Sequence, residues 1–362
     1  MTDQITPQPG IMEIALYQGG QSAIPGRSDV LKLSSNENPL GPPPAAQQAI
    51  AAAAASAHLY PSTDHAELRA AIGGVHGLDP DRIICGVGSD EVLQFVTQAF
   101  AGPGDEIIHT EHGFSLYPVL IHMAGATAVT VAERERVVDV DAILAAITGR
   151  TRVILVTNPG NPTGTMLPEG EVSRLLDSVP ERIVVVLDGA YTEYADGYDG
   201  GAAMATERSN VLMTRTFSKV YGLGGLRIGW GYGARWLIDV MTRIRQPFNL
   251  STVQLNAGKA AVLDRAWVND CVALNRAQRA RLVGALGQLG IACDESQTNF
   301  VLARFADAVE AGAAHRALLD DGIIVRKVAG YGFPEGLRIT VGDAEQTGRV
   351  IATLTNWREA AA

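Results

Sequence analysis

The chain has 362 residues, 47% of them hydrophobic and 19% charged, a balance typical of a globular protein without bulk disorder. A single hydrophobic core usually stops growing below this length, so two domains are expected. The formal net charge of -10 at pH 7 opposes binding to a nucleic-acid backbone, so any anionic ligand has to be held by a local set of donors.

The first forty residues are rich in glycine, proline and asparagine. They end in the segment from Asn36 to Gly41, which three further prolines at 42–44 follow. This composition predicts an extended arm and not a packed unit. A helix is expected next, over about residues 45–57.

From Arg82 onward, short apolar runs alternate with helix-like segments. The expected strands cover residues 83–85, 106–109, 128–131, 153–157, 183–187, 211–214 and 228–232, and the expected helices cover 91–100, 140–147 and 169–179. A continuous apolar run such as Ile183 to Leu187 is typical of a strand buried on both faces of a largely parallel sheet. The alternation therefore predicts an α/β layered domain.

After about Leu250 the strand pattern gives way to longer helical stretches, including one near residues 270–289. Short strands are then expected over residues 300–303, 323–326 and 337–340. This pattern predicts a smaller α+β domain at the C-terminal end. We therefore expect an arm over residues 1–44, a large domain over 45–250 and a small domain over 251–362.

Cysteine usage and apolar runs bear on the cellular compartment. Cys85, Cys271 and Cys293 are far apart and form no Cys-x-x-Cys pair, which favours a reducing cytoplasm over a disulfide framework or a structural zinc site. The first ten residues show no basic region followed by an apolar stretch, so no signal peptide is expected. The longest run of small apolar residues, 49–57, is too short to cross a bilayer. We expect a cytoplasmic protein.

Several familiar motifs can be set aside. Residues 86–91 begin like a dinucleotide-binding fingerprint, but Glu91 stands where that motif needs glycine. The chain has no Gly-Lys-Ser/Thr loop and no Gly-x-Ser-x-Gly elbow. His109 and His112 could be paired as metal ligands, but two lone histidines near a strand end are more often structural, so no metal site is expected.

Polar residues remain at the ends of several predicted strands. They are residues 89–91, the turn 161–164, Asp188 with Tyr191, residues 216–219 and Arg227. Because the carboxyl ends of parallel strands converge on one crevice, these residues are expected to share a site.

Each group also has a purely structural explanation. Ser89 followed by two carboxylates is an ordinary start of a helix, and the segment beginning at Asn161 is an ordinary turn. Lys219 and Arg227 could be surface charges. Asp188 is more informative, because a carboxylate directly after a buried strand needs a partner.

Together, these residues fit a pyridine cofactor with a phosphate tail. Such a cofactor needs an anion at its ring nitrogen, a donor at its phenolate oxygen, a phosphate cradle and an amine for its aldehyde. In that order the sequence supplies Asp188, then Asn161 with Tyr191, then Ser89, Ser218 and Arg227, and finally Lys219.

The order Asn161-Pro-Thr-Gly, Asp188-x-Ala-Tyr191, Ser218-Lys219 and then Arg227 resembles the fold type I aminotransferases that depend on pyridoxal 5′-phosphate (PLP). Three longer stretches, residues 35–41, 215–223 and 337–342, are similar to the histidinol-phosphate aminotransferase family. The resemblance spans nearly the whole chain. It implies an α/β fold whose three-layer large domain holds a mostly parallel seven-stranded sheet, with a smaller α+β domain beside it.

Position by position, the resemblance implies that Lys219 holds PLP as a Schiff base and later moves protons. Asp188 would pair with the pyridinium nitrogen, and Asn161 and Tyr191 would bond the ring's 3′ oxygen. The other cofactor contacts that it implies are Gly88, Ser89, Asp90, Phe114, Thr216, Ser218 and Arg227.

The resemblance also implies a homodimer with shared active sites. Tyr60 matches a tyrosine that reaches the phosphate of the other subunit, and the arm would contribute to the small domain and to dimer contacts. The residues that match substrate-contact positions are Tyr17, Asn161, Arg326 and Arg338. Ser62 to Asp64, Phe114, Gly189 and Leu16 depart from the usual family pattern, but none of these departures removes a cofactor contact.

The implied reaction is transamination of L-histidinol phosphate with 2-oxoglutarate, through two half-reactions at Lys219, to give imidazole-acetol phosphate and glutamate. Three alternatives stay open at this point: a broad aminotransferase of phenylalanine and tyrosine, a decarboxylase of threonine phosphate, and a PLP-binding regulator without activity.

Overall fold

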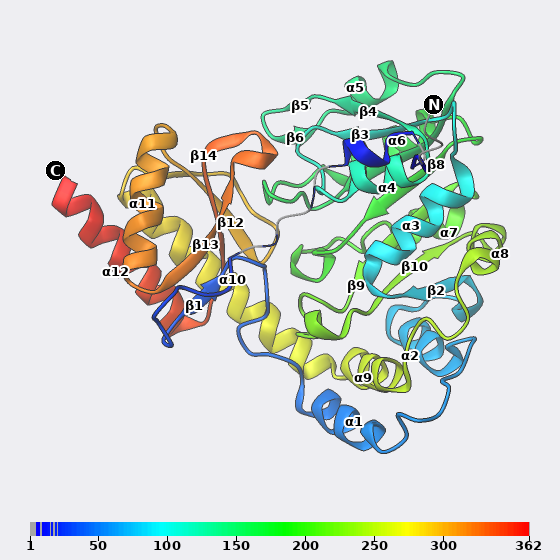
Figure 1. Cartoon of the computed structure of the whole chain (residues 1–362), viewed down its shortest axis with the longest axis horizontal. Coiled ribbons are helices and arrows are strands. Elements are labelled where there is room, and N and C mark those ends of the chain that lie inside the picture. The colour runs from blue at the N-terminus through cyan, green and yellow to red at the C-terminus, as the bar shows by residue number, and fades with distance from the viewer. Residues whose placement is uncertain (1–4, 8, 15, 17–18, 20, 362) are drawn as a thin grey trace.

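The computed structural model describes residues 5–7, 9–14, 16, 19 and 21–361. Within these ranges a large domain surrounds a seven-stranded sheet, and a smaller domain surrounds a five-stranded sheet (Figure 1). The predicted α/β fold class is confirmed.

The large sheet contains all the strands predicted for this part of the chain, each to within two residues. They are β2 (Ile83–Gly86), β3 (Glu106–Thr110), β4 (Thr127–Val131), β7 (Thr151–Thr157), β8 (Val184–Asp188), β9 (Val211–Thr216) and β10 (Gly229–Gly233). Their order across the sheet is β2, β10, β9, β8, β7, β3, β4. Strand β10 runs antiparallel to both of its neighbours, and the other pairs are parallel.

Helices cover both faces of the large sheet. One face holds α3 (Gly88–Phe100), α4 (Tyr117–Met123) and α8 (Arg235–Ile244), and the other holds α2 (Ala66–His76), α5 (Val140–Ala145), α6 (Glu169–Ser178) and α9 (Thr252–Leu263). Along β8, Val184 and Val186 pack toward the first set, whereas Val185 and Leu187 pack toward the second. Both faces are therefore buried, which explains the continuous apolar run.

The small domain contains one antiparallel sheet with one added parallel strand. Its strands lie in the order β1 (Leu31–Leu33), β13 (Ile323–Val328), β14 (Phe333–Thr340), β12 (Phe300–Arg304) and β11 (Ala292–Cys293), and its helices are α10 (Arg265–Gln288), α11 (Ala308–Asp320) and α12 (Ala344–Ala361). The expectation that the whole arm is unpacked is wrong for β1. This strand pairs in parallel with β13, and Leu33 is buried in the small-domain core.

The large domain also contains two further α-helices and a hairpin. They are α1 (Pro44–Ala54), α7 (Ala202–Glu207) and the two-stranded hairpin of β5 (Glu133–Arg134) and β6 (Val137–Val138). Helix α1 confirms the predicted helix, although it ends three residues early, whereas α2, α4, α7, α8 and the hairpin were not predicted. In the part of the chain that the structure describes, no helix is long and apolar enough to span a membrane.

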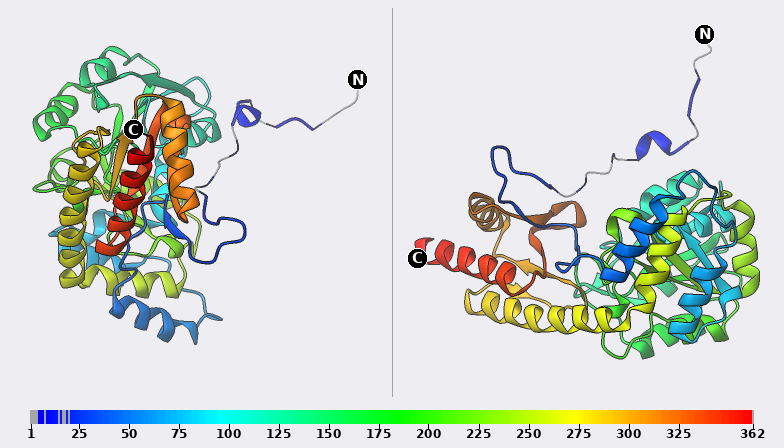
Figure 2. Two further views of the ribbon diagram at one scale, coloured as in Figure 1. Left: turned by 90° about the vertical axis from the view of Figure 1, so that its left-hand side faces the viewer. Right: turned by 90° about the horizontal axis from the view of Figure 1, so that it is seen from below.

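Helix α10 connects the two cores. Its first half places Val268 and Cys271 in the core of the large domain, and its second half places Leu282 and Leu286 in the core of the small domain. The right-hand view of Figure 2 shows this yellow helix running along the small domain to the large domain. Helix α9 packs on α1 and α2. We therefore infer that the domain boundary lies within α10 and not at residue 250, where the sequence suggested it.

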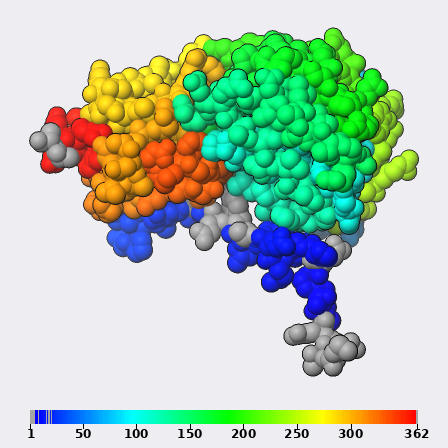
Figure 3. All heavy atoms as spheres, turned by 90° about the horizontal axis from the view of Figure 1, so that it is seen from above, coloured from blue at the N-terminus to red at the C-terminus, as the bar shows by residue number. Residues whose placement is uncertain are grey.

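The domains also touch beside the large sheet. Arg136, in the β5–β6 hairpin, donates to both oxygens of Asp294 at 2.7 and 2.8 Å, and Tyr331 donates from its hydroxyl to Ser115 at 3.0 Å. In Figure 3 the orange C-terminal segments lie directly against the teal segments of the large domain. These contacts bring both domains to the carboxyl ends of the large-sheet strands.

Candidate active site

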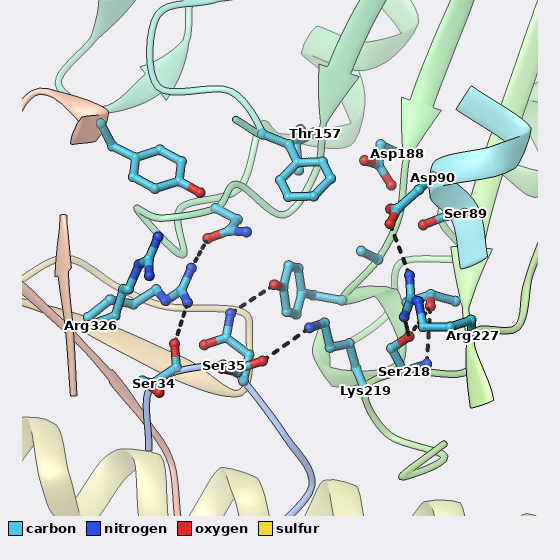
Figure 4. A pocket seen from close by; sticks show the side chains of 18 residues that line it. Ser34, Ser35, Ser89, Asp90, Thr157, Asp188, Ser218, Lys219, Arg227 and Arg326 are labelled. Atoms are coloured by element: carbon cyan, nitrogen blue, oxygen red, sulfur yellow. Dashed lines mark hydrogen bonds and ion pairs between the residues drawn. The ribbon is translucent and has the colours of Figure 1, made fainter. Parts of the chain in front are cut away.

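A cavity of about 210 Å³ lies at the carboxyl ends of β7, β8 and β9, where the two domains meet (Figure 4). The residues that line it are Ser34, Ser35, Asn36, Ser89, Asp90, Phe114, Thr157, Asn161, Asp188, Ala190, Tyr191, Thr216, Ser218, Lys219, Arg227, Arg326, Tyr331 and Arg338. The expectation that distant polar groups share one crevice is confirmed. It receives nearly all of the predicted site residues.

Lys219 follows β9 and presents its amine to the cavity. Its Nζ donates to the backbone carbonyl of Ser35 at 3.4 Å and lies 5.6 Å from the centre of the Tyr191 ring. Burial, together with the nearby Arg338 guanidinium, lowers the pKa of Lys219 to about 8. Lys219 is therefore not an ordinary surface lysine, because roughly a tenth of its amine is neutral and nucleophilic at pH 7, against less than about a thousandth for an unperturbed lysine.

Asp188 ends β8 and is only 3% exposed. Its two carboxylate oxygens accept hydrogen bonds from the Tyr117 hydroxyl at 2.9 Å and from the Thr214 hydroxyl at 3.0 Å. Burial raises the pKa of Asp188 to about 6 against the opposing effect of these two donors. A cationic partner in the cavity would stabilise the charged form of this carboxylate.

Tyr191 and Asn161 project into the cavity from neighbouring loops. The Tyr191 hydroxyl accepts from the side-chain amide of Asn36 at 2.9 Å, and burial raises the pKa of the phenol. The Asn161 side-chain oxygen accepts from Arg338 at 2.6 Å. The side-chain amide of Asn161 and the phenol of Tyr191 are thus both held beside Lys219 by residues of the arm and the small domain.

An anion-binding corner forms where α3 begins. The first turn of a helix leaves backbone N–H groups without intrahelical partners, and here they belong to residues that include Ser89 and Asp90. Arg227 donates to the Ser218 hydroxyl at 3.1 Å and to the Asp90 carboxylate at 2.9 Å. Figure 4 shows Ser218, Arg227 and Asp90 gathered on this side of the cavity.

Gly88 does not line the cavity but shapes this corner. Its φ is +76°, and a Cβ atom here would lie 2.5 Å from the guanidinium of Arg227. Only glycine allows the backbone this close to Arg227. The N-cap of α3 is Val87, and its N–H donates to Glu91 at 2.7 Å, so Ser89 is not the cap that the structural explanation assumed.

Two arginines form the opposite wall. Arg326 on β13 and Arg338 on β14 are register partners on adjacent strands. Arg338 is buried, donates to the Ser34 carbonyl at 2.9 Å, and lies 5.3 Å from the centre of the Phe300 ring. With Lys219 between this wall and the Arg227 corner, the cavity presents cations at both ends although the chain as a whole is acidic.

Some lining residues were missed by the sequence interpretation. Asn36 adopts the left-handed region with φ 56°, which asparagine tolerates well, and this turns its amide toward Tyr191. Thr157 also lines the cavity, and it shares a hydrogen bond of 2.6 Å with Tyr117, which lies behind the lining residues. Tyr331 carried no recognisable signal. Only the Asn36 segment stood out in the sequence, as part of a motif without an assigned role.

Two predicted residues lie elsewhere. Tyr60 is 83% exposed and packs against Phe248 with 4.6 Å between ring centres, outside the cavity of its own chain. Tyr17 lies outside the described residues. Neither role is tested by the single chain.

Comparison with known proteins gives a consistent result. The family model described as "Aminotransferase class I and II" matches residues 28–354. Histidinol-phosphate aminotransferases of Ruegeria pomeroyi and Jannaschia sp. are 64% and 60% identical, over 99% and 98% of this chain and 100% and 99% of their own. The crystal structure of the Sinorhizobium meliloti histidinol-phosphate aminotransferase in complex with pyridoxal-5′-phosphate matches with a TM-score of 0.85 and 27% identity over 92% of each chain.

Proposed function

The chain belongs to the class I and II aminotransferase family, and we propose that it transfers the amino group of L-histidinol phosphate to 2-oxoglutarate with PLP as its cofactor. The products are imidazole-acetol phosphate and glutamate. The observation that carries this proposal is the buried Lys219 amine between an anion-binding corner and a pair of arginines. The names of relatives up to 64% identical over the full chain support the substrate.

The lining residues fit PLP without an unexplained charge. Bound PLP supplies an electron sink to the substrate carbon. Asp188 would hold the proton of the ring nitrogen, because this buried carboxylate has two neutral hydrogen-bond donors and would gain from a cationic partner. Arg227, the Ser218 hydroxyl and the first turn of α3 would hold the phosphate. Phe114 would cover one face of the ring.

Lys219 is the group in this site suited to moving protons. A general base works best when its pKa lies near the operating pH, and the pKa of Lys219 is lowered to about 8. The same amine would hold the cofactor between turnovers. Tyr191 and Asn161 would donate to the ring's 3′ oxygen from positions that Asn36 and Arg338 fix.

Arg338 and Arg326 would bind the anionic end of each substrate. A planar guanidinium pairs with phosphate and with carboxylate through two parallel hydrogen bonds. One arginine wall can therefore serve both histidinol phosphate, which has no carboxylate, and 2-oxoglutarate. Asn161 accepts from Arg338 and so holds the guanidinium toward the cavity.

We also propose a cytoplasmic homodimer. Tyr60 and Phe248 form an exposed aromatic pair, and a second copy packed over them would receive Tyr60 in its own site. All three cysteines are free, which suits a reducing compartment.

The test compares turnover of PLP-loaded enzyme on L-histidinol phosphate and on phenylalanine, each with 2-oxoglutarate. We expect a higher kcat/KM with histidinol phosphate, because relatives that are 64% and 60% identical over nearly the whole chain carry that substrate in their names. Equal or higher kcat/KM with phenylalanine would overturn the substrate assignment. Release of CO₂ from threonine phosphate without 2-oxoglutarate would overturn the reaction type.

A further inference from the structure

A buried ion pair lies behind the active site and does not line the cavity. Glu193 belongs to the 3-10 turn η3 (Thr192–Tyr194), and Arg215 belongs to β9. The two charged groups are 3.5 Å apart, and each side chain is only 6% exposed. Tyr191 comes directly before η3, and Thr216 comes directly after Arg215, so each partner adjoins a residue of the site.

The pair lies among many buried polar atoms that have no hydrogen-bond partner within the described ranges. They are the Thr192 hydroxyl oxygen, both carboxylate oxygens of Glu193, Nε of Arg215, Nε2 of His76 and the hydroxyl oxygens of Tyr198 and Tyr221. Most of these residues line a second cavity of about 470 Å³ between η3, β9 and α10. At 3.5 Å the Glu193–Arg215 contact is electrostatic and too long for a good hydrogen bond.

Charged and titratable groups face this pair from several elements. Arg265 of α10 and Arg215 both favour the charged form of Glu193, whereas burial raises the pKa of its carboxyl. His76 of α2 lies on the same side, and burial together with Arg215 and Arg265 lowers the pKa of its ring to about 3. His76 is therefore neutral at physiological pH, and arginine alone compensates Glu193.

Stability alone gives little reason to bury such a pair. The free-energy cost of removing two charges from water offsets most of their attraction, so a buried ion pair contributes weakly to folding. Removing only one partner is nevertheless destabilising, because it leaves an unpaired buried charge. Arg215 is further held by donation to the Asp199 carbonyl and by its position 5.6 Å from the centre of the Trp230 ring. These contacts fix the guanidinium as a rigid support for Glu193.

We infer that Glu193 and Arg215 are a positioning pair that sets Tyr191 relative to Lys219. Tyr191 is the N-cap of turn η3, and its carbonyl accepts from the N–H of Tyr194 at 3.0 Å. Strand β9 leads into the turn that carries Lys219, where Thr216 donates to Ser218 at 3.0 Å. The pair thus joins the segment that bears the phenol to the strand that bears the amine. This inference rests on the proposed function, because it concerns the bound cofactor.

The consequence is measurable in the holoenzyme. A phenol that donates to the cofactor's 3′ oxygen withdraws negative charge from it, which lowers the affinity of the Lys219–cofactor nitrogen for a proton. A displaced Tyr191 loses this effect. In Glu193→Gln the visible absorbance of the bound cofactor should therefore titrate at a pH higher by about one unit, roughly a tenfold change in the proton equilibrium. PLP affinity should fall by a few-fold.

Glu106→Gln is the matched control. Glu106 is also a buried carboxylate paired with an arginine, Arg150, but it starts β3 at the end of the sheet away from the site. This variant should lower the thermal midpoint of unfolding and leave the titration of the absorbance unchanged. If Glu193→Gln behaves like Glu106→Gln, the pair is only structural and the inference is wrong.

Two further variants keep the test decisive if Glu193→Gln folds poorly. Glu193→Asp retains the charge, but its side chain is one methylene shorter. The pH at which the cofactor absorbance titrates should rise in this variant too, by less than in Glu193→Gln. The double variant Glu193→Gln/Arg215→Met leaves no unpaired charge, so it should regain stability while its titration stays shifted. Recovery of both properties would contradict the inference. Wild-type enzyme without any visible cofactor absorbance would instead overturn the proposed function.

Discussion

Replacing Lys219 by methionine should stabilise the apoprotein, and the gain should depend on pH. With a pKa lowered from 10.5 to about 8, the amine is neutral in the folded protein between these two pH values but charged in the unfolded chain. The unfolded chain then binds more protons, so stability rises as the pH rises from about 8 to about 10.5. Below about pH 8 the buried amine destabilises the fold by at most about 3 kcal/mol. Its partial exposure to the cavity makes this value a ceiling.

The assay is urea unfolding of apo wild type and Lys219→Met at about pH 7 and about pH 9.5. The variant should be more stable by up to about 3 kcal/mol at the lower pH and by about 1 kcal/mol at the higher pH, since most of the penalty is relieved in between. Lys327→Met removes an exposed lysine from β13 and serves as the matched control. An advantage of Lys219→Met that stays the same at both pH values would refute the reasoning.

Three further outcomes follow from the site. Arg227→Leu should weaken PLP binding roughly 10- to 100-fold without changing the spectrum of bound cofactor, since charge-assisted hydrogen bonds contribute about 1.5–3 kcal/mol. The exposed Arg235→Leu is the control, and an unchanged PLP titration of Arg227→Leu would contradict this prediction. Asp188→Asn should stabilise the apoprotein above about pH 6, because burial raises the pKa of Asp188 and so disfavours its charged form in the folded protein. The activity of the same variant should fall about 10²-fold or more. Lower stability of the variant apoprotein at neutral pH would be evidence against this. Gly88→Ala should reduce PLP affinity and stability together, because its Cβ would lie 2.5 Å from Arg227 at a φ of +76°. A wild-type PLP affinity in titration and a wild-type midpoint of thermal unfolding would show that Arg227 can move aside.

The sequence predicted the large domain well because its signals are local. The run from Ile183 to Leu187 is apolar throughout since β8 is covered on both faces, and the polar residue that ends it, Asp188, lies in the cavity. Parallel topology then brings the ends of β7, β8 and β9 together. A pattern of buried strands with polar ends therefore contained most of the site.

Tertiary contacts decided what the sequence missed. Leu33 is buried because β1 adds to the edge of β13. The glycine- and proline-rich composition of the arm does not signal that partner, and only the family resemblance implied that the arm contributes to the small domain. Helix α9 packs on α1 and α2, and α10 contributes residues to both cores, so the boundary that we infer lies within α10. Tyr331 reaches the cavity through its contact with Ser115, more than two hundred residues away in sequence.

The most direct test of the proposed function is to find where the cofactor is attached. The PLP-loaded enzyme is reduced with borohydride, digested and mapped by mass spectrometry. The account predicts that the mass of the reduced cofactor is found on the peptide that contains Lys219, and that Lys219→Ala carries none. Cofactor on another lysine, or an unlabelled Lys219 in an active enzyme, would contradict it.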